Sequence, residues 1–277
     1  MANEVHKPVL AGLDDWRGSG AQVSLIVGRD LSVPRIWLPP IKTHPMTDNH
    51  RLRLATILTG QHLEETSGPV LLSRPDAILP ILMPLLSAGI ACALYPLINQ
   101  YGLNFAANDD PIRLRHDGSG RNYNSGWGLP KASRPVEVSL VEAEIRSLQR
   151  FYKIILAATI HEDSTSSNHG YAWVNNFPDH SRRQLIPRFN HLWGKTHLSD
   201  FSGQVVTSNH QTTGRFEEFL MVDFSDGDSV ENWLADLSGA PVICIESPYG
   251  EPLETRIDFG LAMLAAAIGT VMDRSRS

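Results

Sequence analysis

Four short runs of nearly continuous apolar residues recur along this chain, with helix-like and polar segments between them. The runs are RLRLATILTG (51–60), GIACALYPLIN (89–99), IILAATI (154–160) and PVICIE (241–246). A strand with apolar side chains on both sides belongs to a sheet that is covered on both faces, as in parallel sheets joined by helices. We therefore predict an α/β protein, a single α/β/α sandwich domain over residues 1–277 with a mixed, mostly buried sheet.

Two further segments extend this domain. QVSLIV (22–27) and RIWLPP (35–40) predict a strand pair within residues 1–45 that packs on the domain. The long segment between the third and fourth runs is rich in aromatic residues and histidines. Within it, we expect residues 165–215 to be an insertion that walls a pocket.

Three helices are predicted, over residues 73–89, 136–153 and 253–272. The second has the clearest start signal, because Ser139 is a good N-cap and Glu142 stands at the capping-box position. The first has helix-like content although it contains Pro80 and Pro84, which complicate a helix interior.

Composition excludes several classes of protein. Apolar residues make up 42% of the 277 residues, enough for a large core, and charged residues only 19%, which disfavours a disordered chain. The net charge of −6, with no run of Lys or Arg, argues against a broad nucleic-acid-binding surface. Cys92 and Cys244 lie in apolar runs and are expected to be buried thiols, which suits a reducing compartment and a cytoplasmic location.

Nothing in the sequence indicates a membrane protein. The N-terminal segment lacks a basic start followed by an apolar core, so no signal peptide is predicted. The apolar stretch FGLAMLAAAIGTVM (259–272) is too short to span a bilayer, and Arg256, Asp258 and Asp273 flank it closely. We predict that this stretch is a helix packed on the core.

A His or a carboxylate stands at, or directly after, the end of three of the four apolar runs. Ligands bind at the carboxyl ends of parallel strands. His62 and Glu65 come directly after the first run, His161 follows the third, and Glu246 ends the fourth. A single His at a strand end is usually a structural hydrogen-bonding residue, but three such positions on one sheet indicate a common site.

The residue types in this set suit a catalytic zinc. Such an ion takes three protein ligands and leaves one position for water. His62, Glu65 and His161 supply a His, a Glu and a second His, so one zinc per chain is expected. Glu246 is placed to act as general base and acid, and a buried carboxylate at a strand end would otherwise be costly to charge.

Five segments resemble motifs of the zinc carboxypeptidase superfamily in their order along the chain. They are TGQHLEETSG, which resembles the HxxE metal motif, PLINQYG (96–102), GRNYNSGW (120–127), TIHEDS (159–164) and IESPYGEPLETRI (245–257). The superfamily includes metallocarboxypeptidases and the succinylglutamate desuccinylase and aspartoacylase deacylases. The resemblance covers roughly residues 50 to 270. It implies a zinc carboxypeptidase-type fold and a hydrolase that cleaves an amide bond.

The resemblance implies the same metal ligands and the same role for Glu246, and it adds further candidates. Arg113 and Arg115 both qualify to stabilise the oxyanion, and Arg115 is the expected residue with Arg121 in reserve. Arg113 and Arg121 are also expected to bind substrate. Asn124 matches the family Asn that contacts substrate. Tyr171 is a candidate active-site phenol, although a packed loop aromatic is the commoner role.

One departure from the family pattern concerns the substrate. Ser125 stands where the family has an Arg that grips the terminal carboxylate of the substrate with two hydrogen bonds. This puts carboxypeptidase action on a free C-terminus in doubt, unless another Arg such as Arg121 replaces it. The family Asp behind the first His corresponds to Asn122, so Asp117 is a candidate for supporting that His.

Two classes of function remain after this comparison. The first is a zinc-dependent amide hydrolase, a carboxypeptidase-like peptidase or an N-acyl amino acid deacylase, acting on a small-molecule or peptide substrate. The second is a non-catalytic ligand- or peptide-binding protein on the same fold, for which Ser125 is the best support. A serine hydrolase is disfavoured, because the GxSxG pattern is absent. The sequence does not indicate an oligomeric state.

Overall fold

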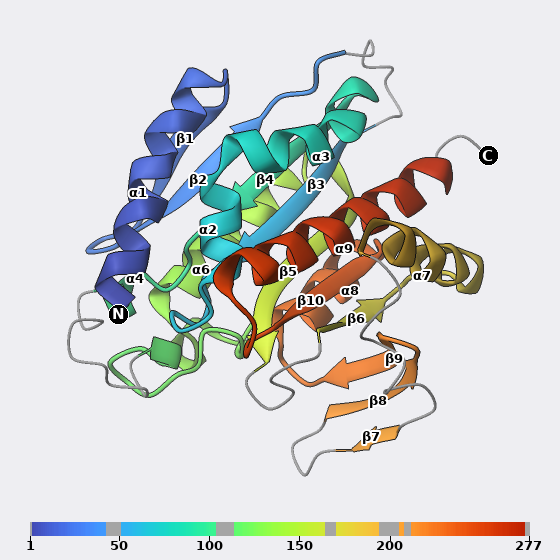
Figure 1. The fold of residues 1–277 in the computed structure, drawn as a ribbon. Helices are drawn as coiled ribbons and strands as arrows, with labels where there is room; N and C mark the ends of the chain where they lie inside the picture. The colour runs from blue at the N-terminus through green and yellow to red at the C-terminus, as the bar shows by residue number, and fades with distance from the viewer. Residues whose placement is uncertain are drawn as a thin grey trace.

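The computed structural model describes residues 2–42, 51–103, 114–163, 170–193, 205–207 and 212–274. Within this part of the chain one ten-stranded mixed sheet has the order β1-β2-β4-β3-β5-β10-β6-β9-β8-β7 (Figure 1). The strands are β1 (Gln22–Val27), β2 (Ser32–Leu38), β3 (Leu52–Thr59), β4 (Ile90–Tyr95), β5 (Tyr152–Asp163), β6 (Tyr171–Asn175), β7 (Val205–Thr207), β8 (Thr212–Glu217), β9 (Leu220–Asp226) and β10 (Val242–Pro248).

Helices cover both faces of this sheet. They are α1 (Ala2–Gly18), α2 (Ser67–Ser73), α3 (Pro75–Ser87), α4 (Gln100–Leu103), α6 (Val136–Leu148), α7 (Asp179–Trp193), α8 (Val230–Ser238) and α9 (Leu253–Arg274), with a 3-10 turn at Lys131–Ser133. The predicted α/β class with a covered, mixed sheet is confirmed.

The centre of the sheet is parallel and corresponds to the four apolar runs. β3 pairs in parallel with β4 and β5, and β5 pairs in parallel with β10. The side chains of β4 are buried along its whole length, as a strand covered on both faces requires. The carboxyl ends of β3, β5 and β10 therefore lie side by side, and the residues that follow them meet at one edge.

One face of the sheet packs against α1, α2, α3, α7 and α9. The core on this side contains Val9, Leu13 and Trp16 from α1, whose spacing places them on one side of the helix. The indole nitrogen of Trp16 donates a hydrogen bond to the carbonyl oxygen of Leu72 at 2.8 Å, which ties α1 to α2. The axes of α2 and α3 meet at an angle of 78°, and Arg74 lies between the last residue of α2 and the first residue of α3.

The opposite face packs against α6 and α8. Its core includes Val138, Val141 and Ile145 of α6 and Val230 and Leu234 of α8. α8 lies over β5 and β10, the two strands whose ends carry predicted site residues. Its first turn therefore reaches the back of the site.

One helix was not predicted, and one prediction about local structure needs correction. The N-terminal strand pair forms, because β1 and β2 are antiparallel partners, but the helix α1 that precedes it was not expected. The helix predicted over 136–153 begins at Val136 directly after Pro135 and ends at Leu148, so Ser139 is not its N-cap. The Ser139 hydroxyl instead accepts a hydrogen bond from Arg134 at 3.0 Å, while Pro135 fixes the entry to the helix.

α9 is a long and largely apolar helix. By length and composition its segment Leu253–Asp273 could cross a membrane, and so could α2 and α3 if the bent pair counted as one span. In the structure, however, 61% of the most apolar window of α9 is buried, and the helix packs against α2, α3 and α7. This agrees with the predicted core-packed helix, and such helices commonly pass the same composition test.

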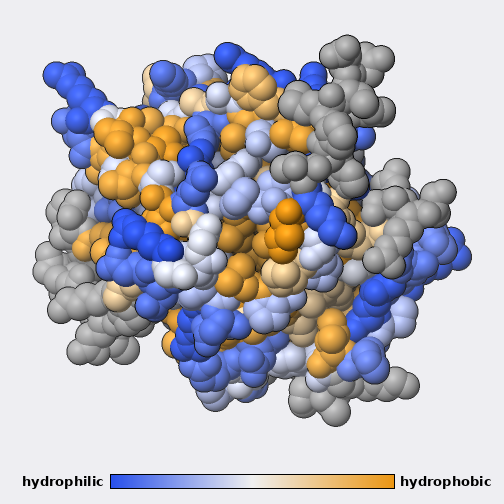
Figure 2. Space-filling model, turned by 90° about the horizontal axis from the view of Figure 1, so that it is seen from above, coloured by the Kyte–Doolittle hydropathy of each residue, from blue (hydrophilic) through white to orange (hydrophobic). Residues whose placement is uncertain are grey.

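The surface seen from above in Figure 2 shows hydrophobic side chains in several separate areas, with hydrophilic side chains between them. Among the described residues with large exposed side chains are Leu25 and Val27 of β1, the first strand in the sheet order. Scattered apolar side chains of this kind are ordinary on a globular surface.

We expect Phe259→Ala to be strongly destabilising. The Phe259 ring is buried, and its centroid lies 5.2 Å from that of Phe189 and 5.4 Å from that of Trp193. Truncating a buried Phe costs about 3–5 kcal/mol in the free energy of unfolding. Urea denaturation measures this loss, and Phe151→Ala, at a 62% exposed position, serves as control with a change below about 0.5 kcal/mol. A loss below 1 kcal/mol at Phe259 would contradict the packing seen here.

Candidate metal centre and active site

The register of the sheet places three predicted residues in one row. His161 of β5 is paired with Glu246 of β10, and Glu246 is paired with Tyr171 of β6. Side chains alternate between the two faces of a strand, so residues paired across neighbouring strands point to the same face. His161, Glu246 and Tyr171 therefore project side by side on the face that α8 covers.

The turn after β3 brings His62 and Glu65 to this row. The backbone nitrogen of Glu65 donates to the His62 carbonyl oxygen at 3.3 Å, and buried Leu63 anchors the turn by donating to Leu114 at 2.9 Å. The turn starts at Gly60, whose φ of +69° favours glycine. A Cβ at Gly60 would also lie 2.9 Å from the Cα atom of Leu97.

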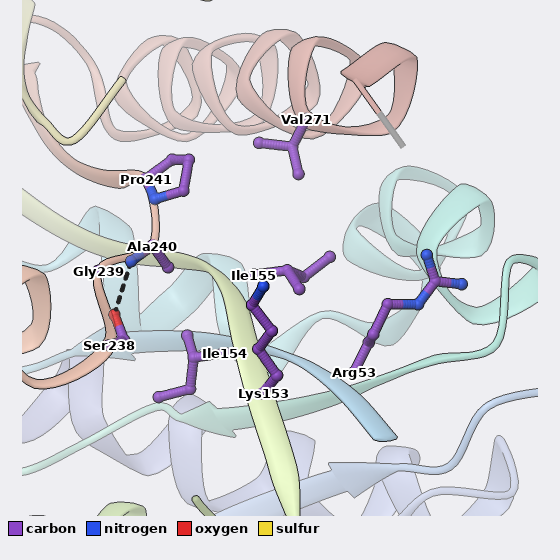
Figure 3. Close-up of a pocket in the computed structure, with 9 residues that line it drawn as sticks. All are labelled: Arg53, Lys153, Ile154, Ile155, Ser238, Gly239, Ala240, Pro241 and Val271. Atoms are coloured by element: carbon purple, nitrogen blue, oxygen red, sulfur yellow. Dashed lines mark hydrogen bonds between the residues drawn. The ribbon is translucent and has the colours of Figure 1, made fainter. Parts of the chain in front are cut away.

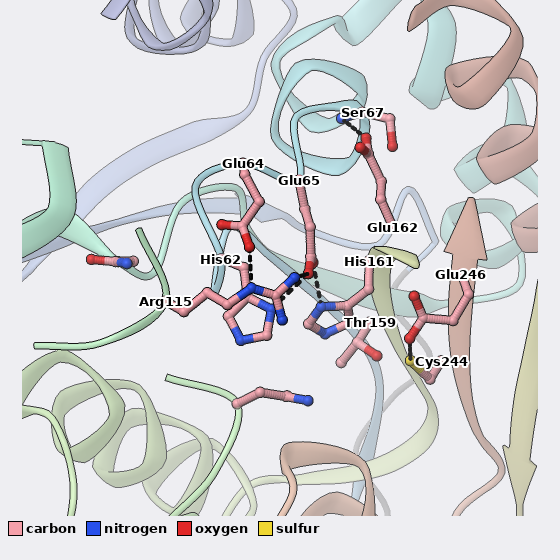
Figure 4. A network of polar contacts seen from close by, with 12 residues as sticks. His62, Glu64, Glu65, Ser67, Arg115, Thr159, His161, Glu162, Cys244 and Glu246 are labelled. Carbon is pink, nitrogen blue, oxygen red and sulfur yellow. Dashed lines mark hydrogen bonds and ion pairs between the residues drawn. The ribbon is translucent and has the colours of Figure 1, made fainter. Parts of the chain in front are cut away.

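His62, Glu65 and His161 form one compact buried cluster (Figure 4). The Nδ1 atom of His62 lies 2.6 Å from Oε1 of Glu65, and the Nδ1 atom of His161 lies 2.7 Å from Oε2 of the same carboxylate. Each residue offers one ligand atom, and these atoms lie within 4.8 Å of one another. Two imidazole nitrogens and a carboxylate converging in this way form a donor set that suits a metal ion.

A contact behind His62 fixes the chemistry of its ring. The Oδ1 atom of Asn122 lies 3.1 Å from Nε2 of His62 and also accepts a hydrogen bond from the backbone nitrogen of Asn124 at 2.7 Å. Because Asn122 presents an oxygen there, a proton on Nε2 would find an acceptor when Nδ1 binds a metal. The candidate for this support, Asp117, binds Arg121 instead.

Charge interactions dominate the metal-free cluster. Burial alone would raise the pKa of Glu65, but His62 and His161 lower it by more, and it ends well below its usual range. Burial alone would lower the pKa of His161, but Glu65 and then Glu231 raise it well above its usual range. Without a metal, Glu65 is therefore ionised and His161 carries a proton.

Glu246 lies beside this cluster and has a different electrostatic environment. Burial raises the pKa of its carboxyl group. His161 opposes this rise, whereas Glu65, Asp163 and Glu231 add to it, and the pKa ends well above its usual range. A carboxyl group with a raised pKa binds a proton more readily than an ordinary carboxylate, which suits general acid–base catalysis.

Arg115 reaches the cluster from the loop side. Its guanidinium forms an ion pair with Glu64, and its Nη2 atom lies 3.3 Å from Oε1 of Glu65 (Figure 4). The side chain is 37% exposed. A partly exposed cation beside the metal ligands is where a polarised substrate carbonyl would need a hydrogen-bond donor.

The cluster opens into a polar cavity of about 520 Å³. Four predicted residues beside the metal ligands line it: Glu246, Arg115, Asn124 and Tyr171. The Oδ1 atom of Asn124 is buried and has no hydrogen-bond partner among the described residues, so it is available to a substrate N–H group. The Tyr171 hydroxyl donates to Oδ2 of Asp163 at 2.9 Å, and its ring stacks on Trp173.

A second cavity of about 300 Å³ lies at the other end of the parallel strands (Figure 3). Arg53 and Lys153 are the charged groups that line it, and the other lining residues are mostly apolar, including Ile154, Pro241 and Val271. It contains no carboxylate or His among the described residues. Of these two cavities, the first combines a candidate metal centre with acid–base groups.

Two predicted substrate-binding residues are not placed in the first cavity. Arg121 does not line it, because its Nε atom donates to Oδ2 of Asp117 at 2.7 Å and its Nη1 atom to the carbonyl oxygen of Ala132 at 3.1 Å. Arg113 lies outside the described residues. Roles in substrate binding for both arginines stay predictions.

Sequence reasoning missed several residues of the site. Glu64 was not singled out, although it stands beside Glu65 and pairs with Arg115. Glu162 was also missed. It is buried, accepts a hydrogen bond from the backbone nitrogen of Ser67 at 2.5 Å and pairs with Arg256 of α9. The sequence does contain a signal for Glu162, because it directly follows His161 at the end of a predicted strand. Consecutive side chains of a strand point to opposite faces of the sheet, so Glu162 could be expected to face away from His161.

Several solved structures are similar in fold to this chain. A metallo-carboxypeptidase from Burkholderia cenocepacia matches with a TM-score of 0.64 and 17% identity over 96% of this chain and 68% of that one. A candidate metallopeptidase from Shewanella denitrificans matches with a TM-score of 0.64 and 17% identity over 99% and 91%. Bovine thrombin-activatable fibrinolysis inhibitor, in complex with tick carboxypeptidase inhibitor, matches with a TM-score of 0.63 and 10% identity over 99% and 97%.

No family model and no curated protein matches the sequence. At identities this low, structural similarity establishes the fold and leaves the reaction open. The chain has a zinc carboxypeptidase-like fold, which confirms the fold implied by the sequence resemblance.

Proposed function

We propose that this protein is a zinc-dependent hydrolase that cleaves an amide bond, either as a carboxypeptidase-like peptidase or as an N-acyl amino acid deacylase. The observation that carries the proposal is the buried cluster of His62, Glu65 and His161, with Glu246 paired to His161 across the sheet. A bound zinc would polarise the substrate carbonyl and lower the pKa of a water molecule.

The protein residues supply the remaining steps. Glu246 accepts a proton as the water oxygen forms its bond to the carbonyl carbon, and passes that proton to the leaving nitrogen as the C–N bond breaks. Arg115 donates to the carbonyl oxygen as negative charge develops on it. The unpartnered Oδ1 atom of Asn124 orients the substrate by accepting a hydrogen bond.

A panel of matched substrates distinguishes a peptidase, a deacylase and a non-catalytic binding protein. Zinc-loaded protein is incubated with N-acetyl amino acids, with short peptides that have a free C-terminus, and with the same peptides amidated at the C-terminus. Hydrolysis that stops on chelation supports the proposal, and activity on amidated peptides would agree with Ser125 in place of the family Arg. No hydrolysis of any amide by protein with bound zinc would favour the non-catalytic binding protein.

Zinc affinity should increase as pH rises. His161 holds a proton in the metal-free protein because its pKa is raised, so zinc must displace that proton from Nδ1. Release of one proton makes the apparent Kd fall by about tenfold per pH unit until the pH exceeds the raised pKa of His161. Glu65 adds nothing to this slope near neutral pH, because its pKa is lowered.

Calorimetry in two buffers with different ionisation enthalpies measures the number of protons released. An apparent Kd that does not change between pH 6 and pH 7 would contradict a protonated His161. A stronger dependence, corresponding to two protons, would show that a further group of the cluster is protonated in the metal-free protein.

A further inference from the structure

A second buried carboxylate, Glu231, lies behind His161 on the side away from Glu65. It occupies the first turn of α8, after the N-cap Ser229, and α8 packs on β5 and β10. The Oε1 atom of Glu231 lies 3.6 Å from Nε2 of His161, and both side chains are almost fully buried. Glu231 therefore faces the ring nitrogen that points away from the ligand cluster.

Glu231 is held in place by its own contacts. The Thr159 hydroxyl donates to its Oε1 atom at 2.5 Å, and Thr159 precedes His161 by two positions on the same face of β5. The N-terminus of α8 favours a negative charge at this position. The carboxylate is thus fixed in place by contacts from two elements.

The Nε2 atom of His161 is buried and makes no hydrogen bond within 3.5 Å to the described residues, and it lies 3.6 Å from Glu231. A buried N–H group without an acceptor is costly, so a carboxylate at this distance favours a proton on this nitrogen. The Nδ1 lone pair is then directed at the metal position.

The two histidine ligands differ in the group that lies behind the Nε2 atom of each ring. His62 has a neutral amide oxygen behind its Nε2 atom, from Asn122, whereas His161 has a carboxylate. A carboxylate behind a ligating His fixes the ring and makes it a stronger ligand. The stronger support is therefore on the ligand that comes from the rigid sheet.

We propose that Glu231 is a positioning residue that orients His161 and strengthens its bond to the metal. The proposal rests on the zinc site proposed above and extends it to a residue that contacts neither metal nor substrate. Its central feature is the placement of a fixed carboxylate 3.6 Å from the outer nitrogen of a buried ligand.

A competing role for Glu231 is ligation of a second ion. Ligand atoms of His161, Glu231 and Cys244 lie within 4.8 Å of one another. In that case the ring of His161 would lose both protons and bridge two ions. Burial raises the pKa of the Cys244 thiol, and Glu231 and Glu246 raise it further, which disfavours a thiolate ligand there. The stoichiometry of bound metal separates the two roles.

The test measures zinc affinity by competition with a chelator of known Kd, for wild type and Glu231→Gln. This variant keeps the size of the side chain and removes its charge. We expect the Kd for zinc to rise by about 10–100-fold, with one zinc still bound at saturation. Glu142→Gln is the matched control, because Glu142 is a buried carboxylate that pairs with Arg134 and Arg146, away from the histidines. Its Kd should stay within about threefold of wild type.

A second variant tests the role independently of any loss of packing. Asn122→Asp on the Glu231→Gln background places a carboxylate behind His62 instead, and should recover at least part of the lost affinity. The visible absorption bands of bound Co²⁺ should change in Glu231→Gln and keep the wild-type form in Glu142→Gln, because they report ligand strength and geometry.

The outcomes are distinct. A Kd for Glu231→Gln within threefold of wild type would overturn the positioning role while leaving the zinc site intact. Two zinc ions in wild type and one in Glu231→Gln would also overturn it, and would make Glu231 a ligand. Failure of wild type to bind zinc at all would overturn the proposed function itself, together with this inference.

Discussion

Glu246→Gln is expected to lower the rate of amide hydrolysis by at least about 10²–10⁴-fold, the usual contribution of a general acid–base group. The variant keeps the shape of the side chain but cannot accept the proton from water. Zinc content should stay at one ion per chain, because Glu246 is not one of the three clustered ligands. The measurement pairs the hydrolysis rate with metal analysis of the same protein sample.

Glu254→Gln provides the control for this prediction. Glu254 lies on α9, where its exposed carboxylate pairs with Arg74, and it does not line the cavity. That variant should hydrolyse substrate at the wild-type rate. Near wild-type activity in Glu246→Gln would exclude the acid–base role, and loss of zinc from it would make Glu246 a ligand instead.

His161→Ala is expected to abolish stoichiometric zinc binding and, with it, all activity. The change removes one of three ligands and leaves Glu65 and Glu231 buried beside an empty space. Plasma mass spectrometry of untagged protein should find about one zinc per chain in wild type and almost none in the variant. His180→Ala is the control, because His180 is exposed on α7 and should not affect zinc content.

Folding of the His161→Ala variant needs a separate check. Removing one partner of a buried charge pair costs about 3–5 kcal/mol, which could unfold a marginal protein. His161→Gln keeps a polar side chain at the position and should fold more easily while still binding zinc poorly. Circular dichroism of both variants separates loss of metal from loss of structure. Full zinc content in a folded variant would show that His161 is not a ligand.

The candidate metal cluster could be predicted from the sequence because of where strands end. His62, Glu65, His161 and Glu246 each follow or end an apolar run, and parallel strands bring their carboxyl ends to one edge. The class of fold follows from the same runs. These features depend on local patterns and on a general rule of sheet topology, and a single sequence carries both.

Other parts of the site depend on contacts that the sequence does not encode locally. Glu231 was missed because its meaning arises only when α8 packs across β5 and β10. Arg121 was held in reserve as a group that binds substrate, yet Asp117 pairs with it. Asn122 was treated as the loss of a carboxylate, whereas its amide oxygen still contacts His62. Each of these outcomes was decided by three-dimensional packing.

The row formed by His161, Glu246 and Tyr171 has a consequence for how activity appears during refolding. A slip of β10 by one residue against β5 would turn Glu246 to the opposite face of the sheet, so only the native register assembles the site. The two strands are far apart in sequence, and pairings of this kind form slowly. Recovery of activity with zinc present should therefore follow the last, slowest phase of sheet formation, with no active intermediate before it.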